Sequence, residues 1–145
     1  MAKPVAICCM GAILAALAVP MRAQDRLTVL LDQYRHEADA VRKARVLAKL
    51  GADQVGKARE QWKSGDDVAS LDTLQKYRDE VRETVTALEA AVPDAEKKPA
   101  GYKELQISLR ETVRHIDDLI LELPVDKRPA IHDRGIVVFD RSAAR

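Results

Sequence analysis

The three histidines, His36, His115 and His132, are the side chains best suited to bind a metal ion or move a proton near neutral pH. Glu111 lies four residues before His115 and Asp118 three residues after it, so these three share one helix face. A metal site inside a helical bundle needs inward-facing ligands from several helices, often as Glu-x-x-His, and this chain lacks that spacing. We therefore expect a solvated contact and no metal. A small-ligand or metal-binding bundle that uses His36 and His115 is the alternative.

Nucleophiles for hydrolysis are equally poorly placed. None of the serines beyond the N-terminal segment lies in a Gly-x-Ser-x-Gly turn, and the chain has no glycine-rich phosphate-binding loop. Both cysteines, Cys8 and Cys9, lie in the N-terminal segment. The sequence therefore predicts no catalytic residue, no cofactor and no enzymatic activity. The serines are Ser64, Ser70, Ser108 and Ser142.

Residues suited to protein binding form a short set. Trp62 is the single tryptophan, and we expect it to pack against the following helix, with a binding hot spot as the alternative. The connector at residues 96–103 combines three lysines with a glycine and a tyrosine, which could recognise an acidic partner, although a solvated linker is the simpler interpretation. The predicted partner-binding residues are Trp62, Lys97, Lys98, Tyr102 and Lys103.

The first 23 residues have the composition of a secretory signal peptide. Lys3 gives a positive start, an uncharged and largely apolar run covers residues 5–19, and small residues follow. Cleavage is expected after Ala23, with Ala18 as the alternative. An uncleaved anchor is less favoured, because the run is shorter than the roughly 20 apolar residues of a spanning helix. The sequence therefore predicts a secreted or periplasmic bacterial protein.

The mature chain has nearly balanced charge. The full sequence has 24 basic and 23 acidic side chains, and removal of Lys3 and Arg22 leaves a formal net charge of −1. Without a basic excess, we expect no binding to nucleic acid, and membrane contact only through an uncleaved signal segment. The mature chain also has no cysteine and few aromatic residues, which disfavours a disulfide scaffold or an aromatic-lined pocket.

Apolar residues recur at helical spacing over most of the mature chain. Residues 25–63 predict one long helix, with Gly51 as the position of a bend or a break. Gly65 and the following Asp66 or Asp67 predict a turn and a new N-cap, so a second helix should cover residues 67–91. Its expected buried face includes Val68 and Leu71.

A third helix is predicted from residue 102 to Pro124, where apolar spacings of three and four continue for six turns. The expected fold is an all-α antiparallel three-helix bundle over residues 24–124. An unbroken first helix would extend beyond the others, and this overhang, over residues 51–62, suggests a surface for self-association. Residues 125–145 should form an irregular tail, in which the apolar run at 136–139 resembles a short strand.

One segment resembles the middle of a tetratricopeptide helical hairpin. Its small, aromatic, Gly-Asp and apolar positions follow the order of that motif, although Tyr77 stands where the family prefers a small residue and no second copy occurs at a 34-residue period. With the signal segment and the Lys-Lys-Pro-Ala-Gly-Tyr helix start, the chain is similar to small secreted bacterial helical proteins of unknown function. The matching residues are Ala58, Trp62, Gly65, Asp66, Ser70, Leu71 and Leu74.

Overall fold

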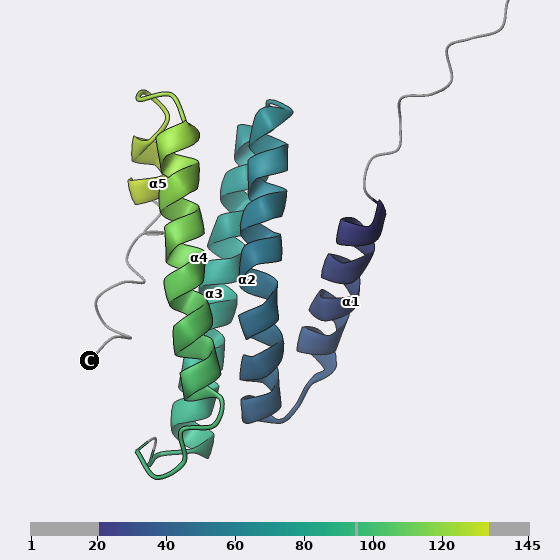
Figure 1. Ribbon diagram of the computed structural model, residues 1–145, viewed down its shortest axis with the longest axis vertical. Coiled ribbons are helices and arrows are strands. Elements are labelled where there is room, and N and C mark those ends of the chain that lie inside the picture. The colour runs from purple at the N-terminus through teal and green to yellow at the C-terminus, as the bar shows by residue number, and fades with distance from the viewer. Residues whose placement is uncertain (1–20, 95, 134–145) are drawn as a thin grey trace, which may run out of the picture.

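The computed structural model describes residues 21–94 and 96–133, and every regular element in these ranges is a helix (Figure 1). The predicted all-α class is therefore confirmed for this part of the chain. Residues 1–20 of the predicted signal peptide and the predicted strand at 136–139 lie outside the described residues. The helices are α1 (Met21–His36), α2 (Ala40–Lys63), α3 (Asp67–Ala91), α4 (Tyr102–Glu122) and α5 (Pro129–Asp133).

The prediction of one long first helix is wrong, because the chain breaks between α1 and α2. The Asp39 side chain accepts a hydrogen bond from the backbone N–H of Arg42 at 2.8 Å, so Asp39 is the N-cap of a new helix. After this break α1 runs beside α2 in the opposite direction (Figure 1). The predicted overhang is therefore not formed, and it offers no surface for self-association.

The predicted turn at Gly65 is confirmed. Gly65 adopts a φ of +86°, and the Asp66 side chain accepts a hydrogen bond from the N–H of Ala69 at 3.0 Å. The left-handed conformation closes α2 and the aspartate caps α3, so the two helices form a tight hairpin. Both α3 and α4 pack on α2. Val68 is 64% exposed, which corrects the prediction that it faces the core.

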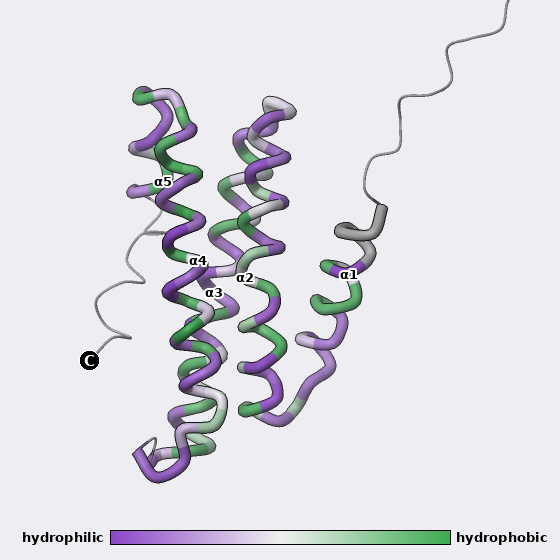
Figure 2. The backbone as a smooth tube through the Cα atoms, viewed as in Figure 1, coloured by the Kyte–Doolittle hydropathy of each residue, from purple (hydrophilic) through white to green (hydrophobic). Residues whose placement is uncertain are grey.

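The apolar interior consists of two clusters, and Figure 2 shows the apolar positions recurring along each helix. The lower cluster joins α1 to the connector end of the bundle and includes Tyr34, Leu47 and Leu88. The upper cluster lies toward the α2–α3 turn and includes Leu74 and Leu119. Among the described residues, no helix is both long and apolar enough to cross a membrane.

Gly51 lies between the two clusters, inside α2 and not at a break. A Cβ atom at this position would lie 2.2 Å from Thr112 Oγ1 and 2.7 Å from the Tyr77 hydroxyl oxygen. Glycine is therefore needed here because α3 and α4 side chains fill the space beside the α2 backbone. The predicted break does not lie at Gly51, since α2 continues through that position.

Candidate functional site

The predicted partner-binding residues lie at opposite ends of the bundle. Trp62 is in the last turn of α2, whereas the connector joins the end of α3 to the start of α4 (Figure 1). The structure therefore brings the connector residues together but places Trp62 elsewhere. One continuous surface containing all five residues is not formed.

Trp62 has structural contacts at the upper end. Its ring packs partly buried against the upper cluster, and the Lys127 ammonium lies 5.1 Å from the ring centroid. Lys127 also forms an ion pair with Asp67 at the start of α3. This contact raises the pKa of the Lys127 ammonium. Trp62 thus helps to join α2 to the segment that leads into α5.

A shallow apolar groove adjoins the connector, and we name it the connector groove. It has a volume of about 450 Å³, and its floor is formed by aliphatic and proline side chains from three parts of the chain. Val41 comes from the first turn of α2 and Val92 from the end of α3, so the groove exists only because these helix ends meet the connector. Its lining residues are Val41, Val92, Lys98, Pro99, Ala100, Lys103 and Glu104.

Three contacts hold the connector in position. Gly101 has a φ of +87° and donates its N–H to Glu104 Oε2 at 2.8 Å. A Cβ at Gly101 would lie 3.1 Å from Leu88, so the loop backbone is close to the lower cluster. The Tyr102 hydroxyl donates to the Val92 carbonyl at 3.3 Å. The groove is therefore formed by a fixed loop, which lowers the entropy lost on binding.

The three predicted lysines differ in their surroundings. The Lys97 ammonium is paired with Asp94 at 2.8 Å. Within the described ranges, the ammonium groups of Lys98 and Lys103 have no carboxylate partner, and both side chains are exposed at the groove. Glu104, the acidic lining residue, accepts a hydrogen bond from the Gly101 N–H and forms an ion pair with Arg45. The backbone hydrogen bonds and Arg45 lower the pKa of its carboxyl. The rim therefore presents two available cations.

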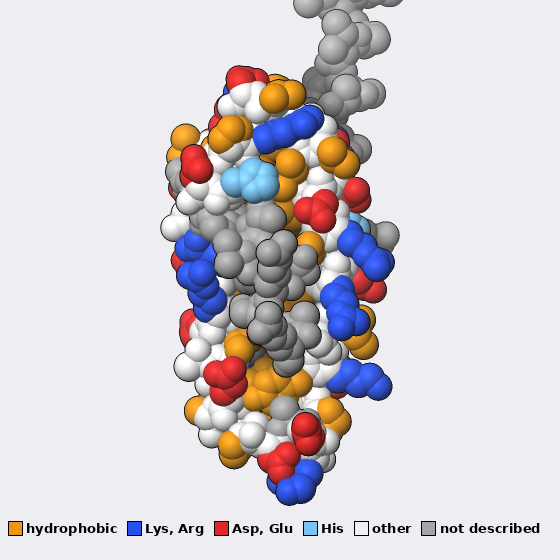
Figure 3. All heavy atoms as spheres, turned by 90° about the vertical axis from the view of Figure 1, so that its left-hand side faces the viewer, with side chains coloured by type: hydrophobic (Ala, Val, Ile, Leu, Met, Phe, Trp, Pro, Cys, Tyr) orange, Lys and Arg blue, Asp and Glu red, His pale blue; other side chains and the backbone are white. Residues whose placement is uncertain are grey.

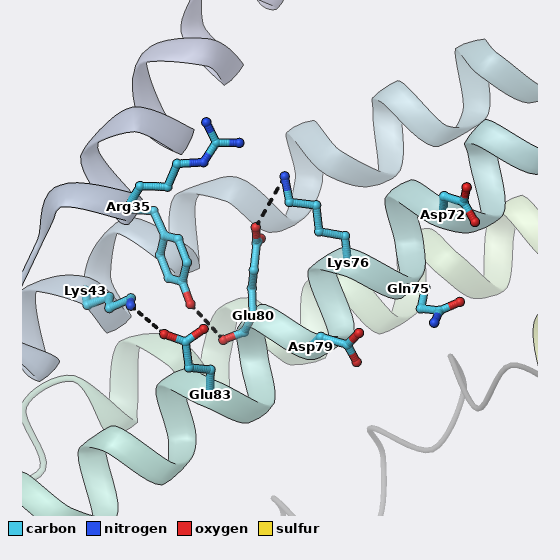
Figure 4. A pocket seen from close by; sticks show the side chains of 9 residues that line it. Arg35, Lys43, Asp72, Gln75, Lys76, Asp79, Glu80 and Glu83 are labelled. Carbon is cyan, nitrogen blue, oxygen red and sulfur yellow. Dashed lines mark hydrogen bonds and ion pairs between the residues drawn. The ribbon is translucent and has the colours of Figure 1, made fainter.

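A second, more polar groove lies where α1 meets α3, and we name it the Glu80 groove (Figure 4). It has a volume of about 610 Å³. The Tyr34 hydroxyl donates to the Glu80 carbonyl at 3.0 Å and lies 2.9 Å from Thr84 Oγ1. Lys43 pairs with Glu83 at 2.7 Å, and its ammonium lies 4.6 Å from the Tyr34 ring centroid. These contacts attach α1 to the rest of the bundle.

Glu80 is an acidic side chain with only 10% of its side-chain surface exposed. The nearest cation is Lys76 at 3.9 Å, beyond hydrogen-bond distance, and Oε2 accepts no hydrogen bond from the described residues. Burial raises the pKa of the Glu80 carboxyl, although Lys76, Arg35 and Lys43 oppose this effect. Glu80 is not among the site residues that the sequence predicts. Its place beside Tyr77 and Val81 in a helix with a buried face could have indicated it.

Replacement of Glu80 by glutamine should stabilise the protein at neutral pH. Because its pKa is higher in the folded than in the unfolded state, ionisation costs stability as pH rises above the ordinary value of 4.5. Glu80→Gln removes that cost and keeps the side-chain size. Thermal unfolding should show a higher Tm for the variant at pH 7 and no gain at about pH 3.5, where glutamate is protonated in both states. A lower Tm at pH 7 would show that the ionised carboxylate stabilises the fold.

The histidines do not converge. His36 ends α1, where its Nδ1 lies 2.8 Å from the Asp32 carbonyl, and His115 is exposed on α4. His132 is exposed on α5. Over residues 21–94 and 96–133, no group of three or more His, Cys, Asp or Glu side chains is arranged to hold a metal ion. The metal-binding alternative therefore gains no support from the geometry of these residues.

Comparisons with models of protein families, with curated proteins and with solved structures find no match for this chain. The resemblance of the α2–α3 hairpin to a tetratricopeptide hairpin therefore stays a prediction. The connector groove is the candidate site, since it combines the predicted residues Lys98 and Lys103 with an apolar depression that no sequence pattern predicts.

Proposed function

We propose that this chain is an exported helical protein–protein interaction or scaffold module without catalytic activity. In this proposal α2, α3 and α4 form the three-helix core, α1 is docked on α2, and a protein partner binds at the connector. The observation that carries the proposal is the connector groove, where an apolar surface on a fixed loop is bordered by two lysines that have no carboxylate partner among residues 21–94 and 96–133. Apolar area for affinity and charge for selectivity are the usual components of a protein-binding surface.

Secretion to the periplasm or beyond is part of the same proposal. It is supported by the charged start, the apolar run and the small residues of the first 23 positions. The chemical identity of the mature N-terminus, determined by mass spectrometry of the protein from its own cells, tests this part. An N-terminus at Gln24 is expected, and an intact Met1 in a protein recovered from the cytoplasm would contradict export.

Photocrosslinking in those cells tests the binding role. A photoreactive benzoylphenylalanine at Ala100, an exposed lining residue, should give a discrete adduct with a second protein. The matched control carries the same group at Asp118, which is exposed on α4. We expect several times more adduct from position 100 than from position 118. Equal yields at the two positions, or none at either, would contradict a partner at the connector groove.

A further inference from the structure

The floor of the connector groove favours an aliphatic side chain as the group that enters it. The lining residues other than lysine and glutamate are all apolar: Val41, Val92, Pro99 and Ala100. The volume of about 450 Å³ exceeds that of one leucine side chain but is small for a folded element. Burial of a leucine side chain contributes roughly 1.5–3 kcal/mol, which suits a side-chain anchor.

The rim of the groove favours negative charge beside that anchor. Lys98 and Lys103 border the floor, and neither ammonium is neutralised by a carboxylate among the described residues. The opposing Glu104 is paired with Arg45 at 3.2 Å and with the Gly101 N–H. The groove also adjoins the N-terminus of the 21-residue helix α4, whose dipole adds positive potential.

We propose, on the basis of the proposed function, that the connector groove binds an acidic segment of the partner protein. One aliphatic side chain enters the groove, and carboxylates on both sides of it pair with Lys98 and Lys103. The ligand class is thus a short peptide with an apolar residue between aspartates or glutamates. Its charge complements the rim, and the groove is large enough to admit its single apolar side chain.

The charges around the groove favour a narrow segment over an anionic membrane surface. Asp94 and Glu96 are exposed on the same connector, and a flat anionic surface that reached the lysines would also meet these carboxylates. Figure 3 shows basic and acidic side chains interspersed over the visible face, with both signs together at its lower end. A membrane surface needs an extended basic patch, whereas a peptide needs only the two lysines.

Fluorescence polarisation with synthetic peptides tests this proposal on the purified protein as isolated from its cells. The probe is a labelled peptide with one leucine between aspartates. Two comparison peptides replace the leucine by serine or the aspartates by lysines. We expect measurable binding of the probe, about tenfold weaker binding of the serine peptide, and none of the lysine peptide.

Charge-matched variants locate the binding. Lys98→Gln combined with Lys103→Gln should weaken probe binding about tenfold. The control, Lys57→Gln combined with Lys63→Gln, makes the same charge change at exposed positions in the distal half of α2 and should leave binding unchanged. Ala100→Trp should block the groove without a charge change. Circular dichroism checks that each variant retains its fold.

Several results would overturn the proposal. Equal losses in both double variants would show non-specific attraction, and equal binding of the leucine and serine peptides would exclude the anchor. Binding to vesicles of phosphatidylcholine and phosphatidylglycerol, in the absence of peptide binding, would assign the surface to a membrane. A crosslinked adduct at position 100 without peptide binding would reject the acidic segment and leave the proposed function standing. Absence of that adduct would reject the proposed function itself.

Discussion

Substitution of Gly51 by alanine should lower the free energy of unfolding by about 2 kcal/mol, although alanine is the better helix former. The gain in helix propensity is about 1 kcal/mol. The new methyl group would lie 2.2 Å from Thr112 Oγ1, and that side chain is β-branched, buried and hydrogen-bonded to the Ser108 carbonyl at 2.9 Å. Overpacking of this kind costs about 1–3 kcal/mol, and the severity of the contact places it at the upper end.

Gly56 is the matched control for this substitution. It lies in the same helix, and a Cβ atom there would meet no heavy atom within 4 Å. Gly56→Ala should therefore have the full benefit of the higher helix propensity of alanine and stabilise the protein by up to about 1 kcal/mol. Urea denaturation of both variants measures the difference. If Gly51→Ala also stabilises the protein, the close approach of α2 to Thr112 and Tyr77 is incorrect.

Substitution of Tyr34 by alanine should release α1 from the bundle. Tyr34 is 3% exposed, and loss of a buried aromatic side chain costs about 3–5 kcal/mol. A 16-residue helix has little stability in isolation, so α1 should lose its helical structure when it detaches. Tyr34→Phe keeps the ring but loses the hydroxyl contacts with Glu80 and Thr84, and it should cost about 1 kcal/mol.

Hydrogen exchange with mass spectrometry locates the effect of Tyr34→Ala. Amides of α1 should exchange much faster in the variant, while amides in the centre of α3 and α4 should retain most of their protection. Tyr34→Phe provides the comparison with the ring in place. Uniform loss of protection across all helices would show that α1 is not a separable part of the fold.

Local signals predicted much of the fold. The glycine and aspartates after Lys63 defined the turn, and the α3 bounds are those expected. The break before α2 was missed because Ala38 and Val41 continue the apolar spacing across it, which concealed the cap at Asp39. Gly51 was misjudged because the low helix propensity of glycine is visible in the sequence, whereas the approach of α3 and α4 side chains is a tertiary property.

The candidate site was predictable only in its charged part. The composition of residues 97–103 indicated the lysines. Which of these lysines forms an ion pair depends on where Asp94 and the other carboxylates lie in the folded chain. The apolar floor needs Val41 from a helix more than fifty positions earlier in the sequence, and no local pattern links it to Pro99. The burial of Glu80 had a local signal in its place beside Tyr77 and Val81 on α3, whereas its contacts with α1 are a tertiary property.

The separation of the apolar interior into two clusters favours separate local opening of the two ends of the molecule. Polar side chains, among them Gln54 and Thr112, are buried where the upper and lower clusters meet, so few apolar contacts transmit order between the ends. The free energy of local opening can therefore differ between the two ends. Occupation of the connector end would therefore slow local opening around α1 and the α4 start, and it would leave the fluctuations beside Trp62 nearly unaltered.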